Sequence, residues 1–294
     1  MKRIALLSLL FILLGLGVML WGYSDPPPPA PARVAPQAML LVESDTGSYL
    51  MQLRLGLQES LQARGVTLRV ERAADMDLRA SDAFAGADIL YLHAADPAAL
   101  LARLPQDRPT TVVLGHALRG EVCVVPDLEN GGWQAGLRVL LQRPAGSVLI
   151  VGDENDPAQA LRLQGAQRGL GRQQAQVMTL AQAEAADWSR LGAVLALSGE
   201  DTQALAGWKR AGLMPVALPL FGFDAEDSRV TLLEGRLLQG VVAENAYALG
   251  YLAGELQPQL RTLRPSIHLA PVRLVTLDSL YDAENVKLMF PLLN

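Results

Sequence analysis

Short apolar runs alternate with segments of helical spacing along residues 38–294. Most of these runs are continuous, which is typical of strands that are covered on both faces. On this pattern we expect nine strands, at 38–43, 66–71, 87–93, 110–115, 147–152, 175–180, 193–198, 216–222 and 240–244. Many of the intervals between them are long enough for a helix.

The clearest of these helical segments is residues 49–65. Its leucines recur three or four positions apart, and Gly65 stands where such a helix should end. Regular alternation of strand and helix predicts parallel sheets with helices on both faces. Nine strands over roughly 250 residues fit two doubly wound sheets better than one. The predicted fold class is therefore α/β, with two parallel-sheet lobes.

The first 23 residues predict a membrane anchor. Lys2 and Arg3 are basic, and residues 4–23 carry no charge over a length that allows a helix of ~30 Å. The basic end should stay in the cytoplasm, which places the rest of the chain in the periplasm. The apolar core is longer than in most cleaved signals, so we expect an uncleaved inner-membrane helix. Secretion into the periplasm after cleavage near Ala32 is the alternative.

Residues 24–37 are rich in proline and predict an extended linker between this anchor and the folded part. The net charge of the 294-residue chain is −5, so no nucleic-acid surface is expected. Cys123 is the only cysteine, which excludes an intrachain disulfide. Its apolar setting indicates a buried hydrophobic residue rather than a nucleophile.

Signatures of catalysis are missing from the sequence. It contains no H-E-x-x-H, no G-x-S-x-G and no phosphate-binding loop. His93, His116 and His268 lie in separate segments without metal-ligand spacing. We therefore expect a protein that is not an enzyme and that needs no metal and no cofactor.

Polar and aromatic residues stand where several expected strands end. In open parallel α/β sheets, ligands bind beyond the carboxyl ends of the strands. Carboxylates there accept hydrogen bonds from hydroxyls or amines, and a tyrosine can stack on an apolar ligand face. The candidate ligand contacts at these positions are Asp45, Tyr49, His116, Ser198, Asp224 and Glu244.

The order of several motifs resembles the type I periplasmic binding proteins, which include ribose-binding-protein-like receptors, and the ligand-binding domains of lac-repressor-type regulators. The likeness covers about residues 38–280. The stretches that carry it are 44–65, 127–141, 151–165, 193–205, 221–224, 240–256 and 272–286. Within 127–141 stands the G-G-x-x-A-G pattern of the segment that crosses between lobes in this family. The resemblance implies two lobes joined by a hinge.

By the same resemblance, the first lobe comprises residues 38–126 plus 245–274, and the second lobe comprises 127–244 plus 275–294. Tyr49 matches an aromatic residue that caps the ligand. Arg162 matches an arginine that enters the cleft from a helix. Asp224 matches an aspartate that binds ligand hydroxyls or amines, and Glu244 stands at a polar hinge position. Both Arg162 and Asp224 are then expected to be solvated when no ligand is bound.

Two features depart from the family pattern. Ser198 and Gly199 replace an Asn-Asp pair, so a usual polar contact is shortened or lost. The segment between the strands at 66–71 and 87–93 is too short for a full crossover helix. A structural interpretation of the candidates also stays open: Asp224 as a turn cap, Arg162 as an exposed helix arginine, Tyr49 as a packing residue, Glu244 as a solvated hinge residue and His116 as a loop histidine.

The function implied is a membrane-tethered periplasmic protein that closes two lobes around a small polar solute, sugar-like or amino-acid-like. It would deliver the solute to an ABC transporter or report it to a membrane sensor such as a kinase or cyclase, and a retained anchor favours the sensor. A degenerate lobe pair that binds a protein partner is the main alternative. An enzyme on this fold and a cytoplasmic DNA-binding regulator fit less well, the latter because no helix-turn-helix precedes the first lobe.

Overall fold

The computed structural model describes residues 36–43, 47–80, 82–142, 145–224, 228–260 and 262–290. The chain divides into one unit over residues 1–35 and a second, compact unit from Pro36 to Asn294. The expected anchor at 4–23 lies outside the described residues, as does nearly all of the expected linker at 24–37. Within the described ranges, no helix has both the length and the apolar character that a membrane crossing requires.

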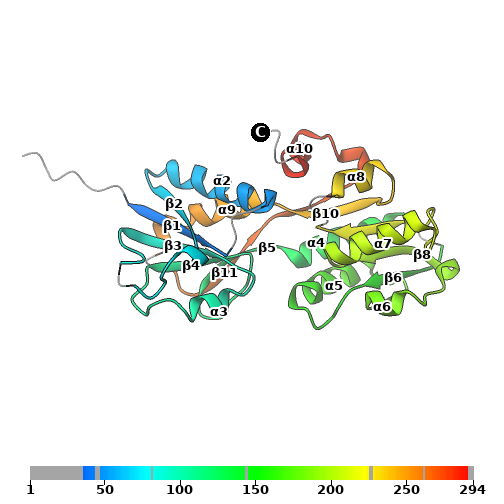
Figure 1. Cartoon of the computed structure of the whole chain (residues 1–294). Helices are drawn as coiled ribbons and strands as arrows, with labels where there is room; N and C mark the ends of the chain where they lie inside the picture. The colour runs from blue at the N-terminus through cyan, green and yellow to red at the C-terminus, as the bar shows by residue number, and fades with distance from the viewer. Residues whose placement is uncertain are drawn as a thin grey trace, which may run out of the picture. The chain divides into compact units, whose positions relative to one another are not determined.

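The first lobe is built on a six-stranded sheet with the order β11-β5-β4-β3-β1-β2, and every neighbouring pair in it is parallel (Figure 1). Buried apolar side chains fill most of its central strands, as expected for a sheet covered on both faces. Its strands are β1 (Gln37–Val42), β2 (Thr67–Arg72), β3 (Ala87–His93), β4 (Thr110–Leu114), β5 (Val122–Pro126) and β11 (Ser266–Ala270).

The second lobe has a sheet of the same size, with the order β12-β10-β9-β8-β6-β7. Its pairs are parallel except that β12 runs antiparallel to β10 at one edge. Its strands are β6 (Ser147–Val151), β7 (Ala175–Met178), β8 (Leu191–Ala196), β9 (Leu220–Phe223), β10 (Gly240–Glu244) and β12 (Val272–Val275).

Helices cover both sheets unequally. On the first sheet, α2 (Ser48–Gln62) and α9 (Ala246–Glu255) bury one face, and the short α3 (Pro97–Leu101) and the 3₁₀ turn η1 (Ala73–Asp75) bury the other. Only 3₁₀ and turn structure stands in the described part of the segment between β2 and β3, as its shortness predicts.

On the second sheet, α4 (Leu128–Leu141) and α5 (Pro157–Leu170) bury one face. The opposite face packs on α6 (Leu180–Ala183), α7 (Gly199–Ala211), α8 (Arg229–Glu234) and α10 (Ala283–Met289). Short 3₁₀ turns complete the described elements: η2 (Trp188–Arg190), η3 (Gln257–Gln259) and η4 (Leu277–Ser279).

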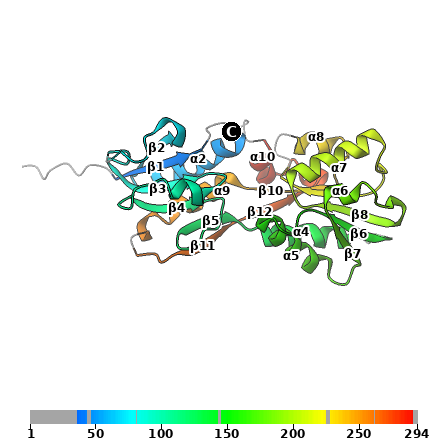
Figure 2. The ribbon, with the colours of Figure 1, turned by 60° about the horizontal axis from the view of Figure 1, so that its bottom comes forward.

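Three short segments carry the chain from one sheet to the other. They lie between β5 and α4, between β10 and α9, and between β11 and β12. The first and the third are joined by a hydrogen bond from the amide of Asp127 to the carbonyl of Ala270. In Figure 2, β12 follows β10 along the edge of the second sheet, which its antiparallel pairing requires.

The predicted fold class is confirmed for the described residues, which form two parallel-sheet α/β lobes. One expected boundary needs correction. The first lobe was expected to extend to residue 274, but residues 272–275 form β12 and pair with β10 of the second sheet. The last crossing therefore lies at Pro271. Because β12 runs antiparallel to β10, it can follow β11 of the first sheet directly, with only Pro271 between the two strands.

Candidate ligand-binding site

Arg162 lies on the buried face of α5, and the local sequence explains its position. Asp156 caps this helix by accepting a hydrogen bond from the amide of Gln159 at 2.8 Å, and Pro157 occupies its first turn. A side chain on Gly132 of α4 would collide with the carbonyl oxygen of Arg162. The glycine therefore lets the two helices cross in contact at the residue that carries the guanidinium.

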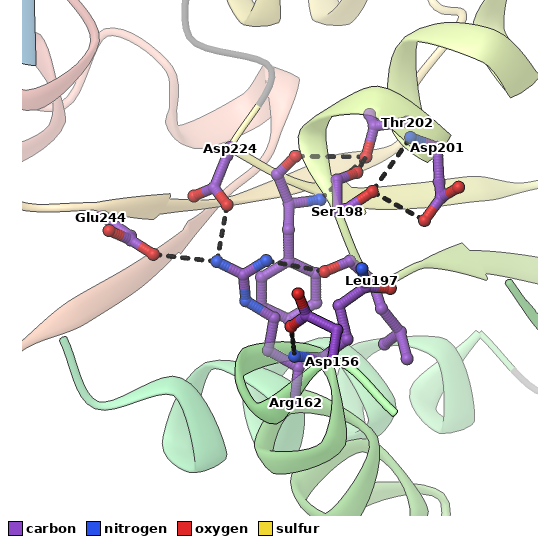
Figure 3. A network of polar contacts seen from close by, with 10 residues as sticks. Asp156, Arg162, Leu197, Ser198, Asp201, Thr202, Asp224 and Glu244 are labelled. Atoms are coloured by element: carbon purple, nitrogen blue, oxygen red, sulfur yellow. Dashed lines mark hydrogen bonds and ion pairs between the residues drawn. The ribbon is translucent and has the colours of Figure 1, made fainter. Parts of the chain in front are cut away.

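The guanidinium of Arg162 binds the ends of three strands of the second sheet (Figure 3). Its Nη1 donates to the carbonyl oxygen of Leu197 at 2.7 Å, just beyond β8. Its Nη2 donates to Asp224 Oδ2 at 2.6 Å and to Glu244 Oε1 at 2.9 Å. The group also lies over the ring of Phe223, 4.8 Å from the ring centre, which is a cation–π distance. Arg162 is only 6% exposed, so its charge is largely removed from water.

Asp224 is the residue that directly follows β9. Its amide donates to the carbonyl of Val242 at 3.0 Å, and its backbone is left-handed, with φ of 57°. Aspartate tolerates this conformation better than most residues. Thr202 fixes the same strand end, because its hydroxyl bonds both the amide and the carbonyl of Phe223 at 3.1 Å. Asp224 thus directly follows the strand and places its carboxylate on Arg162.

Glu244 ends β10 at the crossing into the first lobe. Burial and the neighbouring charge of Asp224 raise the pKa of its carboxyl to about 7, against the opposing effects of Arg162 and of hydrogen bonds from Arg162 and Tyr49. The side chain is 18% exposed, and that of Asp224 is 31% exposed. With both carboxyls ionised, the cluster of Arg162, Asp224 and Glu244, which we call the charged triad, has a net charge of −1.

The first lobe contributes aromatic rings instead of charges. Tyr49, in the first turn of α2, hydrogen-bonds Glu244 and stacks on His93, with 5.7 Å between the ring centres. His93 ends β3, and its Nδ1 lies 3.3 Å from the carbonyl oxygen of Leu114. Burial lowers the pKa of His93, and the charge of His116 acts in the same direction. The neutral imidazole is therefore favoured.

The structure brings four of the expected site residues together, namely Tyr49, Arg162, Asp224 and Glu244. His116 is exposed and close enough to His93 to affect its titration. Asp45 lies outside the described residues. The roles of all these residues in binding a ligand remain predictions.

Ser198 has a structural task that the sequence did not reveal. Its hydroxyl caps α7 by accepting from the amide of Asp201 at 3.1 Å, and it donates to Asp201 Oδ2 at 2.6 Å. The neighbouring carbonyl of Leu197, and not the Ser198 side chain, reaches Arg162. Where the family pattern has Asn-Asp, this chain therefore uses a helix cap.

For Arg162, the structural alternative that was left open and the expectation of a solvated side chain are both wrong. It is neither an exposed helix arginine nor a side chain that is wet in the absence of a ligand, since the described residues bury it and occupy both of its terminal nitrogens. The reason is the close crossing of α4 and α5, which turns the side chain toward the sheet rather than the solvent.

His93 and Thr202 were missed as parts of this region. The strand-end rule would have identified His93, because it is the last residue of an expected strand. Thr202 lies four residues after Ser198 on α7, and nothing in its sequence context signals a bond to a distant strand. Phe223 is buried in the core and makes the additional contact to Arg162.

Comparison with solved structures identifies proteins of the same fold. GanP, a glucose-galactose binding protein from Geobacillus stearothermophilus, is 16% identical, with a TM-score of 0.65 over 85% of this chain and 100% of its own. AraP, an arabinose binding protein from the same organism, is 14% identical, with a TM-score of 0.66 over 84% of this chain and 98% of its own.

A third structure, the XylFII-LytSN complex, matches at 15% identity and a TM-score of 0.66, over 83% of this chain and 99% of that one. No family model matches the sequence, and no curated protein matches it. At such low identities the likeness establishes the fold. The chain thus shares the two-lobed fold of these sugar-binding proteins.

Proposed function

We propose that this chain is a non-catalytic receptor whose two lobes close around a small polar solute, with sugars and polyols as the first candidates. The observation that carries the proposal is the meeting of Tyr49 from the first lobe with the charged triad at the strand ends of the second. This edge of an α/β sheet is where ligands bind in such folds. The sugar-binding proteins among the structural neighbours support the same ligand class.

Within this proposal, each residue has a distinct task. Asp224 and Glu244 accept hydrogen bonds from ligand hydroxyls, since their side chains retain exposed surface. Arg162 holds both carboxylates in place rather than reaching the ligand itself. Tyr49 and His93 offer a flat surface for the apolar face of a sugar ring. Asp45 and His116 are further candidates from the first lobe, and Ser198 contributes by fixing the start of α7.

We further propose that residues 4–23 tether this receptor to the inner membrane, with the two lobes in the periplasm. The support is the uncharged length of that segment and the two basic residues before it. A tether favours a sensing role over uptake, because a co-receptor profits from staying beside its partner. Carbonate-washed membranes should retain the full-length protein with an intact N-terminus. A soluble periplasmic form that begins near Arg33 would refute the tether and leave the receptor proposal intact.

A thermal-shift screen of the full-length protein against sugars, polyols, amino acids and nucleosides tests the receptor proposal. A ligand at a hundred times its Kd should stabilise the fold by about 2.7 kcal/mol through mass action. Small-angle scattering should then show a smaller radius on binding, as hinge closure requires. If no class of solute stabilises the protein, the proposal fails and the alternative of a protein-binding lobe pair replaces it. Chemical turnover of a bound solute would make it an enzyme.

A further inference from the structure

One edge of the first sheet exposes apolar side chains. Among the described strands β11 pairs with β5 alone, and it forms the margin of the first lobe (Figure 2). Ile267 and Leu269 are 58% and 55% exposed, and no other large apolar residue of the described strands is as exposed. Their partners in β5, Cys123 and Val125, pack on the face that α3 and η1 cover. These two elements therefore leave both β11 side chains mostly in water.

The other three edges of the described sheets are protected in ways that β11 lacks. Edge strands commonly avoid pairing with another chain by carrying charges or by being very short. β2 carries Arg69, Glu71 and Arg72, and β12 carries Arg273. β7 is four residues long, and its valine and methionine are half-buried. Residues 266–270 of β11 include no Asp, Glu, Lys or Arg, so a neighbouring strand would meet no charge repulsion there.

The backbone of the two exposed residues also faces outward. The amide of Ser266 and the carbonyl of Ala270 both bond residues that flank β5. Backbone groups of alternate residues point to the same side of a strand, so those of Ile267 and Leu269 point away from the sheet. The edge therefore offers two N–H groups and two carbonyls in the arrangement that an added strand requires.

We propose that the partner of this edge is β11 of a second copy of this chain, paired antiparallel about a two-fold axis at His268. In this register Ile267 lies opposite Leu269 of the second copy. Both residues face outward in each copy, so they exchange N–H and carbonyl bonds, and their apolar side chains meet on one face. The same pair recurs on the other side of the axis. The edge is thus complementary to itself.

This pairing closes at two copies. Pro265 and Pro271 stand directly before and after β11 and have no N–H, which limits the paired segment to five residues. Both copies use the same edge, so no free β11 remains for a third. The second lobe continues from the C-terminal end of β11, and antiparallel pairing therefore places the two second lobes at opposite ends of the paired strands. Such a short interface predicts a dimer in exchange with monomer.

The proposal is independent of the receptor function. The candidate ligand-binding site lies at the ends of other strands, and none of its residues belongs to β11. Failure to find a ligand leaves the dimer untouched, and loss of the dimer leaves the receptor untouched.

Cysteine cross-linking of the full-length protein tests both the partner and the register. The two copies of residue 268 form a pair without hydrogen bonds, with Cα atoms about 4.5 Å apart, which is within disulfide range. His268→Cys should therefore give a disulfide-linked dimer on mild oxidation, seen at twice the mass on a non-reducing gel. The parent should not, because Cys123 is buried.

Ser266→Cys is the matched control on the same face of the same strand. In the proposed register residue 266 lies opposite Ala270 of the second copy, which separates the two introduced thiols by about 14 Å. His268→Cys should give at least about fivefold more dimer than Ser266→Cys. Equal cross-linking at both positions, or none at 268, would show that the pairing is wrong. A link from position 268 to a different polypeptide instead would refute a second copy as the partner.

Lysine substitutions test the apolar contact. Added to His268→Cys, Leu269→Lys should reduce the cross-linked fraction about tenfold, since it places a charge in the paired edge. Leu141→Lys, at a leucine of α4 that is 65% exposed, should leave the fraction unchanged. Equal effects of the two lysines would contradict the proposal.

Sedimentation velocity of the parent provides a test that needs no cysteine. Its mass should rise toward that of a dimer with increasing concentration, and Leu269→Lys or Ile267→Lys should remain monomeric. A parent that is monomeric up to about 100 μM, far above the Kd of a specific micromolar contact, would overturn the proposal even if the cysteine variants fail to fold.

Discussion

The two lobes share one way of packing helices. In the first lobe, Gly56 of α2 and Gly250 of α9 lie against backbone atoms of the partner helix, and in the second lobe Gly132 of α4 and Gly165 of α5 do the same. At each of these positions an added Cβ would collide with a carbonyl oxygen. Close helix pairs of the same construction therefore cover one face of both sheets.

The strand ends of the two lobes differ in chemistry. Those of the first lobe bring together the rings of Tyr49 and His93, with burial favouring a neutral imidazole. Those of the second bring together the charged triad, which is buried around Arg162. The two lobes therefore share the same scaffold but differ in the side chains at their strand ends. The first lobe offers aromatic surface for stacking, and the second lobe offers charged groups.

The helix crossings give the largest expected effect. Gly132→Ala and Gly250→Ala should each destabilise the protein by about 3 kcal/mol or more, because the new methyl group meets backbone that cannot rotate away. If the crossings are equivalent, the two losses in urea denaturation should be similar. Only Gly132→Ala should also disturb the charged triad, since its collision is with the Arg162 carbonyl.

Gly207→Ala is the matched control for both substitutions. Gly207 lies within α7, and open space surrounds the position that its Cβ would occupy. Alanine in a helix interior should then keep or raise stability by up to about 1 kcal/mol. A loss at Gly132 or Gly250 no larger than at Gly207 would show that the crossings are loosely packed.

The second prediction concerns Arg162, the cation at the strand ends of the second lobe. Arg162→Met leaves two partly buried carboxylates beside each other, which should cost about 3 kcal/mol of unfolding free energy at pH 7.5. Part of this loss should be recovered at pH 5, where a carboxyl can take up a proton. Arg168→Met is the control on the same helix: its side chain is 58% exposed and its ion pair with Glu129 should be worth at most about 1 kcal/mol. Equal losses for both variants would contradict a buried triad.

The sequence was sufficient for most of the fold. Each of the nine predicted strands overlaps an observed strand, because a sheet covered on both faces requires continuous apolar segments. The run predicted at 216–222 becomes a strand only from Leu220. The sequence was insufficient for β5, β11 and β12, which are absent from that prediction. β5 is five residues long and ends in Pro126, and β11 alternates exposed with half-buried residues as an edge strand does. β12 is only four residues long. All three are recognisable only once their neighbours are known.

For the candidate site, the sequence identified residues but not their bonds. Strand-end position and family order together selected Tyr49, Arg162, Asp224 and Glu244, which do meet. The burial of Arg162 was missed because it depends on how closely α4 and α5 cross. The sequence shows where the glycines are but not which backbone atoms each of them contacts. The role of Ser198 was missed because a serine at a strand end and a serine at a helix start look alike in sequence.

The third prediction is that stability depends on pH through Glu244, which belongs to the second lobe. A carboxyl whose pKa is raised on folding contributes stability that is present below its unfolded pKa and is lost as pH rises through the folded value. For Glu244 that window runs from its ordinary value of 4.5 to about 7, with Asp224, Arg162 and Tyr49 as the groups that face it. The stability of the parent relative to Glu244→Gln should therefore fall by about 2 kcal/mol across this window. Denaturation at several pH values measures it, and a difference that is flat with pH would refute the raised pKa.

The smallest effect is expected for the contact between Tyr49 of the first lobe and Glu244 of the second lobe. Tyr49→Phe keeps the stack on His93 and removes the hydroxyl that bonds Glu244, so the unfolding free energy should fall by about 1 kcal/mol. Loss of this donor should also raise the pKa of Glu244, because the bond stabilises its carboxylate, and should move the pH window upward. Tyr247→Phe is the control, since its hydroxyl bonds Glu59 at the surface, where water can replace it. If Tyr49→Phe shifts neither stability nor the pH window beyond that control, then Tyr49 belongs to the first lobe alone, and stacking and charge act independently.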